Sequence, residues 1–227
     1  MSPQRPIDPL RPTDSRASER GTAAPPRGRL IVLEGIDGTG KTTLCARLAA
    51  ALREGGREVV ETREPWTSPA GIELRRLLAA KERTTSGEQE LELFHADRAA
   101  HVAERVAPAL ARGAWVVQDR TYWSTAAYQG ARGVPVTAIL ARSRAIAPTP
   151  DLTVLLELTP ELALARIAAN RASVSSFEKL EDLRAVARVY DELARGEPTI
   201  ARLSAAVPLA AVERELLALC RARLGAP

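Results

Sequence analysis

Residues 35–43 read Gly-Ile-Asp-Gly-Thr-Gly-Lys-Thr-Thr and follow the apolar run at residues 30–33. They match G-x-x-x-x-G-K-[ST], a pattern that forms a phosphate-binding loop where a strand leads into a helix. Glycines at 35, 38 and 40 let the backbone wrap closely around an anion, so that consecutive N–H groups point at a phosphate. By chance, a Gly-rich turn of this pattern is expected in roughly one such sequence in a thousand. The stretch therefore predicts a strand, a P-loop and a helix in succession.

The residues of this loop have distinct predicted roles. Lys41 would reach the β- and γ-oxygens of a nucleoside triphosphate, and the Thr42 hydroxyl would bind Mg²⁺. Thr43 is expected to cap the following helix. The predicted ATP-binding residues are Gly35, Gly38, Thr39, Gly40, Lys41, Thr42 and Thr43. Because GTPases, motor ATPases and small-molecule kinases all use such a loop, the substrate has to be inferred from other residues.

Short apolar runs alternate with longer amphipathic stretches after the tail. Five runs are expected to form strands, at residues 30–33, 59–62, 115–118, 154–158 and 199–203. Between them, apolar residues recur at helical spacing, as in Leu44, Leu48 and Leu52. Strands separated by helices favour parallel pairing with right-handed crossovers. We therefore expect an α/β fold, a three-layer α/β/α sandwich around a five-stranded parallel sheet, with ligands at the carboxyl ends of the strands.

Length and charge limit the classes of protein that the chain can represent. With 227 residues, 45% of them hydrophobic, the chain can bury one sizeable core. We expect a disordered tail at residues 1–27, which are rich in Pro and Arg, and a single P-loop domain at residues 28–227. The tail holds five Arg against three acidic residues, so the rest of the chain is nearly neutral. This disfavours binding to a nucleic acid polymer.

The two cysteines and the hydropathy pattern indicate a cellular location. Cys45 and Cys220 lie far apart in helix-like stretches, which favours reduced thiols that fill apolar space over a disulfide. No apolar run reaches the roughly 18 residues that span a bilayer. We therefore expect a cytoplasmic protein with no membrane partner.

Charged residues follow the second and third predicted strands. Arg63 stands where it can clamp an acceptor phosphate bidentately, although a surface ion pair with Glu64 is the competing interpretation. Asp119 stands where a carboxylate can hold Mg²⁺, and Arg120 would lie beside the acceptor. For Asp119 and Arg120 the alternative is an ordinary pair of residues at the start of a loop.

Several separated motifs give the chain a resemblance to the thymidylate kinase family over nearly all of residues 28–223. Family members carry an acidic residue in the P-loop, a strand-end Arg-Glu-Pro, a Phe with an Arg four residues later, and an Asp-Arg pair followed by Ser-Thr and Ala-Tyr-Gln-Gly. In this chain the motifs are Asp37, Arg63-Glu64-Pro65, Phe94-His95-Ala96-Asp97-Arg98, Asp119-Arg120, Ser124-Thr125 and Ala127-Tyr128-Gln129-Gly130. Together they are far more specific than the P-loop alone.

The resemblance implies how a deoxynucleoside monophosphate would be held. Phe94 would stack on thymine while Arg98, one helical turn further along, donates to a base oxygen. Thr125 would contact the thymine edge, Tyr128 would pack where a ribose 2′-OH would sit, and Asp37 would accept from the 3′-OH. Without the resemblance, both aromatic side chains would be assigned to packing.

The resemblance also implies a lid near residues 166–182, and it places Arg75 on a helix beside the acceptor phosphate. An Arg-bearing lid excludes water and stabilises charge in the transition state. Arg171 fits the helix that leads into the lid. Relatives usually carry an Arg where this chain has Ser176, so we expect Arg171 or Lys179 to act in its place.

The leading hypothesis is transfer of the γ-phosphate of ATP to dTMP, giving dTDP and ADP in dTTP biosynthesis, with Mg²⁺ as cofactor. The predicted catalytic residues are Lys41, Arg63, Arg120 and Arg171, and the metal ligands are Thr42 and Asp119. The predicted substrate-binding residues are Asp37, Arg63, Arg75, Phe94, Arg98, Arg120, Thr125 and Tyr128. One alternative is a kinase of another nucleoside monophosphate or of a deoxynucleoside; another is a nucleotide-binding protein whose weakened lid leaves little catalysis. The resemblance further implies a homodimer.

Overall fold

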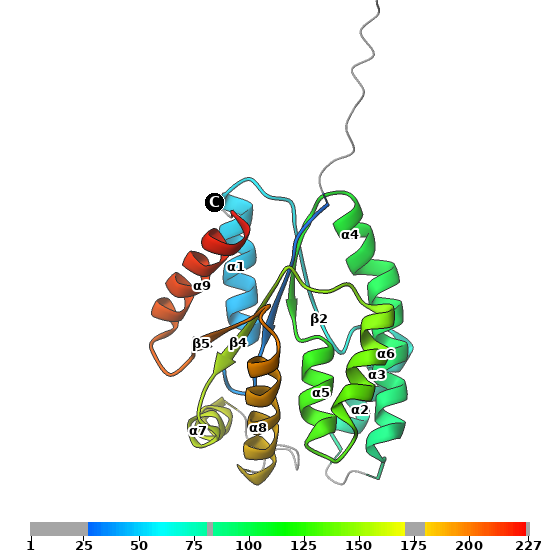
Figure 1. The fold of residues 1–227 in the computed structure, drawn as a ribbon. Coiled ribbons are helices and arrows are strands. Elements are labelled where there is room, and N and C mark those ends of the chain that lie inside the picture. Colours follow the sequence, from blue (N-terminus) through cyan, green and yellow to red (C-terminus); the bar gives the residue numbers. More distant parts are fainter. Residues whose placement is uncertain (1–26, 81–83, 171–179, 226–227) are drawn as a thin grey trace, which may run out of the picture.

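Five strands form one parallel sheet at the centre of the molecule (Figure 1). The computed structural model describes residues 27–80, 84–170 and 180–225, so nearly all of the predicted tail lies outside it. The strands are β1 (Leu30–Glu34), β2 (Val59–Arg63), β3 (Trp115–Asp119), β4 (Leu152–Glu157) and β5 (Ile200–Ser204), in the order β2-β3-β1-β4-β5 with every neighbouring pair parallel. The α/β sandwich predicted from the sequence is confirmed.

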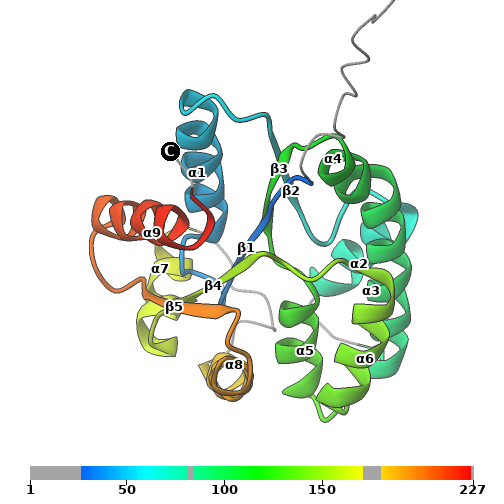
Figure 2. The ribbon, with the colours of Figure 1, turned by 45° about the horizontal axis from the view of Figure 1, so that its top comes forward.

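Helices cover both faces of the sheet. Their bounds are α1 (Lys41–Glu54), α2 (Pro69–Leu78), α3 (Gly87–His101), the π-helical turn η1 (Val102–Val106), α4 (Ala107–Ala111), α5 (Tyr122–Gly130), α6 (Val136–Ile146), α7 (Pro160–Asn170), α8 (Leu180–Gly196) and α9 (Leu209–Leu224). Helices α1 and α9 lie together on one face, and α3, α4, α5 and α6 lie on the other (Figure 2). Among the described residues, no helix combines the length and the apolar character that crossing a bilayer requires.

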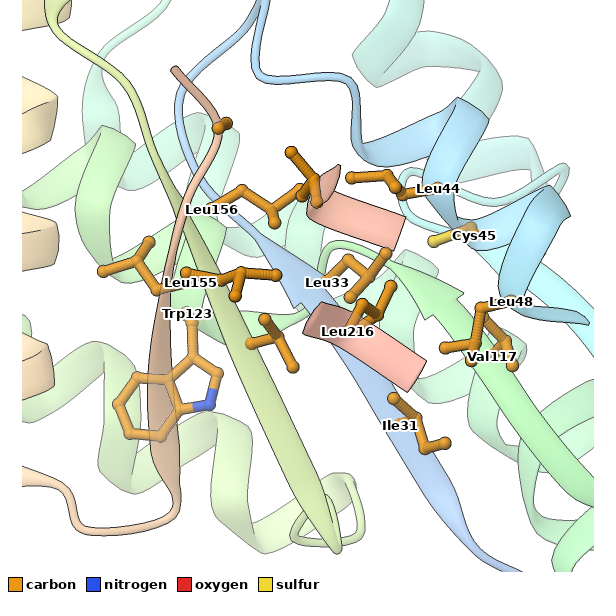
Figure 3. Close-up of a cluster of buried hydrophobic side chains, with 14 of the residues drawn as sticks. Ile31, Leu33, Leu44, Cys45, Leu48, Val117, Trp123, Leu155, Leu156 and Leu216 are labelled. Atoms are coloured by element: carbon orange, nitrogen blue, oxygen red, sulfur yellow. The ribbon is translucent and has the colours of Figure 1, made fainter. Parts of the chain in front are cut away.

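Strand β1 is the middle strand of the sheet and all five of its residues are buried. Side chains alternate between the two faces of a strand, so β1 contributes to two clusters. Ile31 and Leu33 pack with Leu44 and Leu48 of α1 (Figure 3). Leu30 and Val32 belong to the cluster on the opposite face. Because helices cover both faces, this strand is apolar throughout, apart from its last residue.

The strand register brings functional residues to one edge of the sheet. Leu33 of β1 is paired with Asp119 of β3, and Arg63 of β2 is paired with the same Asp119. The carboxyl ends of β2, β3 and β1 are therefore level with one another. Residues that follow these three strands meet in space although they are far apart in sequence, as expected for ligand sites in parallel sheets.

Local details differ from the sequence-based predictions. Strand β4 begins at Leu152 rather than at residue 154. The prediction that Thr43 caps α1 is wrong, because the helix begins at Lys41 and Gly40 is its N-cap, with φ 89° and no side-chain cap. A glycine in that conformation leaves the first amides of the helix facing the loop. Cys45 and Cys220 are buried free thiols, which confirms their predicted role as apolar fillers.

Candidate active site

Glycines with positive φ shape the loop between β1 and α1. The φ angle is 137° at Gly35 and 83° at Gly38. A Cβ atom would lie 2.5 Å from the carbonyl oxygen of Leu156 at the first position, and 2.6 Å from that of Ala163 at the second. Real Cβ atoms do not approach a backbone oxygen so closely, so only glycine lets the loop pass this near to its neighbours.

Replacing Gly38 with alanine is expected to weaken ATP binding by about tenfold or more, because the loop has to move away from Ala163. Gly56→Ala is the matched control. Gly56 also has a positive φ, of 81°, but an added Cβ would meet no atom within 4 Å. Both variants carry the strain of a left-handed alanine, yet only Gly38→Ala should lose ATP affinity in calorimetric titration. Equal ATP affinity in the two variants would contradict the proposed shape of the loop.

Lys41 stands at the mouth of this loop and is only 6% exposed. Its Nζ donates to the Ile36 carbonyl oxygen at 2.8 Å and lies 3.9 Å from the Asp37 carboxylate. Burial, reinforced by the nearby charge of Arg120, lowers the pKa of Lys41 to about 8. An anion in the loop would favour the charged form again. A triphosphate would therefore meet a lysine that is already held close to its binding position.

The two residues predicted to hold Mg²⁺ lie in direct contact. The Thr42 hydroxyl of α1 donates to Asp119 Oδ2 of β3 at 2.6 Å. Asp119 is 7% exposed, and its Oδ1 is buried with no hydrogen-bond partner among the described residues. A buried carboxylate oxygen without a partner is costly unless something else satisfies it. An oxygen pair of this kind fits a hard divalent cation such as Mg²⁺.

A cavity of about 540 Å³ opens beside the P-loop. One end is polar, with the loop itself, Asp119 and Arg120. The other end is mostly apolar and is lined by Arg166, Ile167, Ala205, Val207, Leu209 and Val212. This apolar end was not predicted, because the apolar residues of α7, α9 and the β5–α9 loop carry no distinctive pattern in the sequence. The cavity can take a ligand that carries both charged and apolar groups.

At the end of β2, the side chains of Arg63 and Glu64 differ in exposure and do not pair with each other. Arg63 is exposed, and its side chain makes no hydrogen bond or ion pair with any other described residue. Glu64 is buried and accepts from Arg98 Nε at 3.1 Å and from Arg98 Nη2 at 2.7 Å. Burial opposes ionisation of Glu64, but the Arg98 and His101 side chains outweigh it and lower the pKa of the carboxyl. The alternative of a surface Arg63–Glu64 pair is therefore wrong, and Arg63 is open to an anion.

Arg98 and Thr125, predicted to contact one ligand, lie side by side. Arg98 Nη2 donates to Thr125 Oγ1 at 2.8 Å, and Nη1 donates to Ser143 Oγ at 3.2 Å. Phe94 precedes Arg98 by one turn of α3 and is half-buried, outside the hydrophobic clusters of the described residues. The ion pair with Glu64 was not predicted. It fixes the plane of the Arg98 guanidinium before any ligand binds.

Arg120 follows β3 with a left-handed backbone, at φ 69°. Its Nη1 donates to the Gly35 carbonyl oxygen at 3.2 Å and to Ser124 Oγ at 2.9 Å. Its Nη2 donates to the Asp37 carboxylate and to the Tyr128 hydroxyl, and the guanidinium lies 5.2 Å from the centre of the Tyr128 ring. Burial raises the pKa of Tyr128, so its hydroxyl stays neutral. Three predicted site residues are thus gathered at the P-loop.

The loop after β2 is held by two residues. Arg75 Nη1 donates to the carbonyl oxygens of Pro65 and Trp66 at 2.7 and 2.6 Å, so part of this guanidinium supports the loop. Asp97 of α3 accepts from the Trp66 amide at 2.8 Å and from Ser68 Oγ at 2.5 Å. No role was predicted for Asp97, because nothing in the sequence marks it as buried.

The middle of the predicted lid, at residues 171–179, lies outside the described residues, and with it Arg171, Ser176 and Lys179. The flanking helix ends are described. Arg166 of α7 donates from Nη2 to the Ala205 carbonyl oxygen at 3.0 Å, beside the apolar end of the cavity. Arg166 falls in the predicted lid region, and this contact joins α7 to the loop after β5.

Comparison with known proteins gives consistent results. The family model described as thymidylate kinase matches residues 33–216. The probable thymidylate kinase of Archaeoglobus fulgidus is 42% identical over 187 residues, which cover 82% of this chain and 92% of the relative. The thymidylate kinase of Desulfotalea psychrophila is 41% identical over 191 residues, covering 84% and 93%. That of Xanthomonas euvesicatoria pv. vesicatoria is 45% identical over 168 residues, covering 74% and 73%.

Proposed function

The chain belongs to the thymidylate kinase family, and we propose on this basis that it transfers the γ-phosphate of ATP to dTMP, giving dTDP and ADP. One structural observation supports the proposal independently of the family assignment. The P-loop follows β1 and Arg63 ends β2, on either side of β3, and Asp119 of β3 pairs in register with both neighbours. A donor phosphate and an acceptor phosphate can therefore meet at one edge of the sheet.

On the donor side, the loop amides and Lys41 would hold the β- and γ-phosphates. Thr42 and Asp119 would hold Mg²⁺, and the buried Asp119 Oδ1, which no described residue contacts by a hydrogen bond, supports this assignment. When bound, the ion would offset the negative charge that spreads over the phosphoryl oxygens during transfer. The apolar end of the cavity suits the adenine ring.

On the acceptor side, Arg63 and Arg120 would hold the phosphate of dTMP in line with the γ-phosphate. No general base is needed, because the acceptor phosphate is already nucleophilic. Positioning and electrostatic stabilisation then account for the chemistry, with no covalent intermediate. Arg75 would add to the clamp through the part of its guanidinium that does not support the loop. Arg171 stays a proposed catalytic residue of the lid.

Base and sugar would be recognised by the remaining predicted residues. Phe94 would stack on thymine, and Arg98 with Thr125, which lie within hydrogen-bond distance of each other, would read the base edge. Tyr128 and Asp37 would select deoxyribose. In the structure Asp37 pairs with Arg120, so we infer that the 3′-OH shares this carboxylate with the guanidinium.

A panel of acceptors tests the function directly. ADP release should be measured with dTMP, the other nucleoside monophosphates and the deoxynucleosides, each at several concentrations. The proposal predicts the highest kcat/KM for dTMP and formation of one dTDP per ADP. A higher kcat/KM for another acceptor, or ADP release without dTDP, would contradict it.

The domain bounds, the oligomeric state and the cellular location are further parts of this proposal. We propose that residues 28–227 form the kinase domain and that the protein acts as a homodimer in the cytoplasm. Light scattering of the purified protein would test the homodimer.

A further inference from the structure

Glu34 is a buried carboxylate that the proposed mechanism does not use. It is the last residue of β1 and directly precedes the P-loop. Its Oε1 accepts from the Thr121 amide at 2.6 Å and from Thr121 Oγ1 at 2.9 Å. Its Oε2 accepts from Ser124 Oγ at 2.5 Å and from the Tyr190 hydroxyl at 2.8 Å. An ionised carboxylate has about four acceptor sites, so each site of Glu34 is filled.

These bonds compensate for the burial of a charge. Burial raises the pKa of Glu34, and the donors, together with the nearby charge of Arg120, lower it again in part. A buried acceptor that loses a donor regains no bond from water. Removing a single donor therefore leaves a buried oxygen of Glu34 with an unfilled acceptor site, and the remaining donors have to rearrange around it.

Tyr190 connects a distant helix to this cluster. It lies on α8, is buried, and contacts both Glu34 and Ser124 Oγ, the latter at 2.8 Å. The same Ser124 oxygen accepts from Arg120 Nη1 at 2.9 Å. A continuous chain of hydrogen bonds thus runs from α8 through Glu34 and Ser124 to the guanidinium that we assign to the acceptor phosphate.

We propose that Tyr190 and Glu34 are positioning residues that hold the Arg120 guanidinium in place for the acceptor phosphate. This inference rests on the proposed function. Ser124 accepts from Arg120 while its own hydroxyl donates to Glu34 Oε2, and Tyr190 contacts both that Glu34 oxygen and Ser124 Oγ. Neither Tyr190 nor Glu34 lines the cavity beside the P-loop. Loss of the Tyr190 hydroxyl should therefore weaken the use of dTMP more than the use of ATP.

The test compares the kinetics of two variants, in each of which one buried tyrosine loses its hydroxyl. Tyr190→Phe removes the donor to Glu34 and keeps the ring. Tyr122→Phe is the control, because Tyr122 is buried to a similar degree and its hydroxyl is not among the donors to Glu34, which are Thr121, Ser124 and Tyr190. We expect Tyr190→Phe to lower kcat/KM for dTMP about tenfold or more, with the KM for ATP within about twofold. Tyr122→Phe should match the unmodified protein in both.

Ser124→Ala interrupts the same chain one step nearer to Arg120. It should reproduce the selective loss for dTMP, and the double variant Tyr190→Phe/Ser124→Ala should lose less than the two single losses combined. An unchanged kcat/KM for dTMP in Tyr190→Phe, or equal losses for dTMP and ATP, would overturn the inference alone. Absence of dTMP phosphorylation by the unmodified protein would instead overturn the proposed function, and the inference with it.

Discussion

Lys41→Ala is expected to lower kcat/KM for phosphoryl transfer by about 10²–10³-fold, the usual loss when a preorganised donor to a transition-state oxyanion is removed. Lys41 lies beside the loop amides with its charge already buried, so no flexible surface cation can replace it. The side chain packs at the mouth of the loop rather than in the core, and the variant should stay folded. Steady-state kinetics with dTMP, together with circular dichroism, would measure both effects.

Arg47→Ala is the control for this experiment. Arg47 is a cation on the same helix, half-exposed, and paired with Glu213 at 2.6 Å on the surface. Its removal should leave kcat/KM unchanged. If Lys41→Ala kept the activity of the unmodified protein, the P-loop would have no part in transfer.

Arg98→Ala should have the largest effect on stability, lowering the free energy of unfolding by about 3–5 kcal/mol. Arg98 is fully buried, and its removal takes away two N–H donors to Glu64 Oε2, so the carboxylate stays buried without its ion-pair partner. The variant should also raise the KM for dTMP, because Arg98 is the proposed donor to the base. Urea unfolding and kinetics on the folded fraction would separate the two effects.

Two further variants test whether the loss of stability comes from the buried charge of Glu64. Arg142→Ala removes a bidentate ion pair between α6 and α3 that is exposed to water, and stability should hardly change. Adding Glu64→Gln to Arg98→Ala should restore part of the lost stability, since no buried charge is then left unpaired, without restoring dTMP affinity. Equal destabilisation by Arg98→Ala and Arg142→Ala would refute the role given to burial.

The parts of the site that sequence could predict are those with a local physical signature. Glycine, lysine and threonine at fixed spacing encode the shape of the P-loop, and the contact between Thr42 and Asp119 follows from placing both beside it. Arg63 and Arg120 were predicted because each follows an apolar strand, and parallel strands end at one edge of the sheet.

The parts that could not be predicted depend on contacts between distant elements. Glu64 looked like a surface partner for Arg63, yet it pairs with Arg98, which is 34 residues away. Glu34 stood at the end of an apolar strand, and its partner Tyr190 is 156 residues further along the chain. Nothing in either local pattern distinguishes a buried carboxylate from a solvated one. The π-helical turn after α3 likewise has no local signal.

The central claim is that the P-loop and the residues after β2 and β3 form one continuous site. Its most direct test is calorimetric titration with adenosine and thymidine joined through a polyphosphate chain, followed by displacement with each separate substrate. The account predicts one bound molecule per chain, displaced by ATP alone and by dTMP alone. Displacement by ATP but not by dTMP, with dTMP still binding to the complex, would mean that the two nucleotides occupy separate places and would contradict the account.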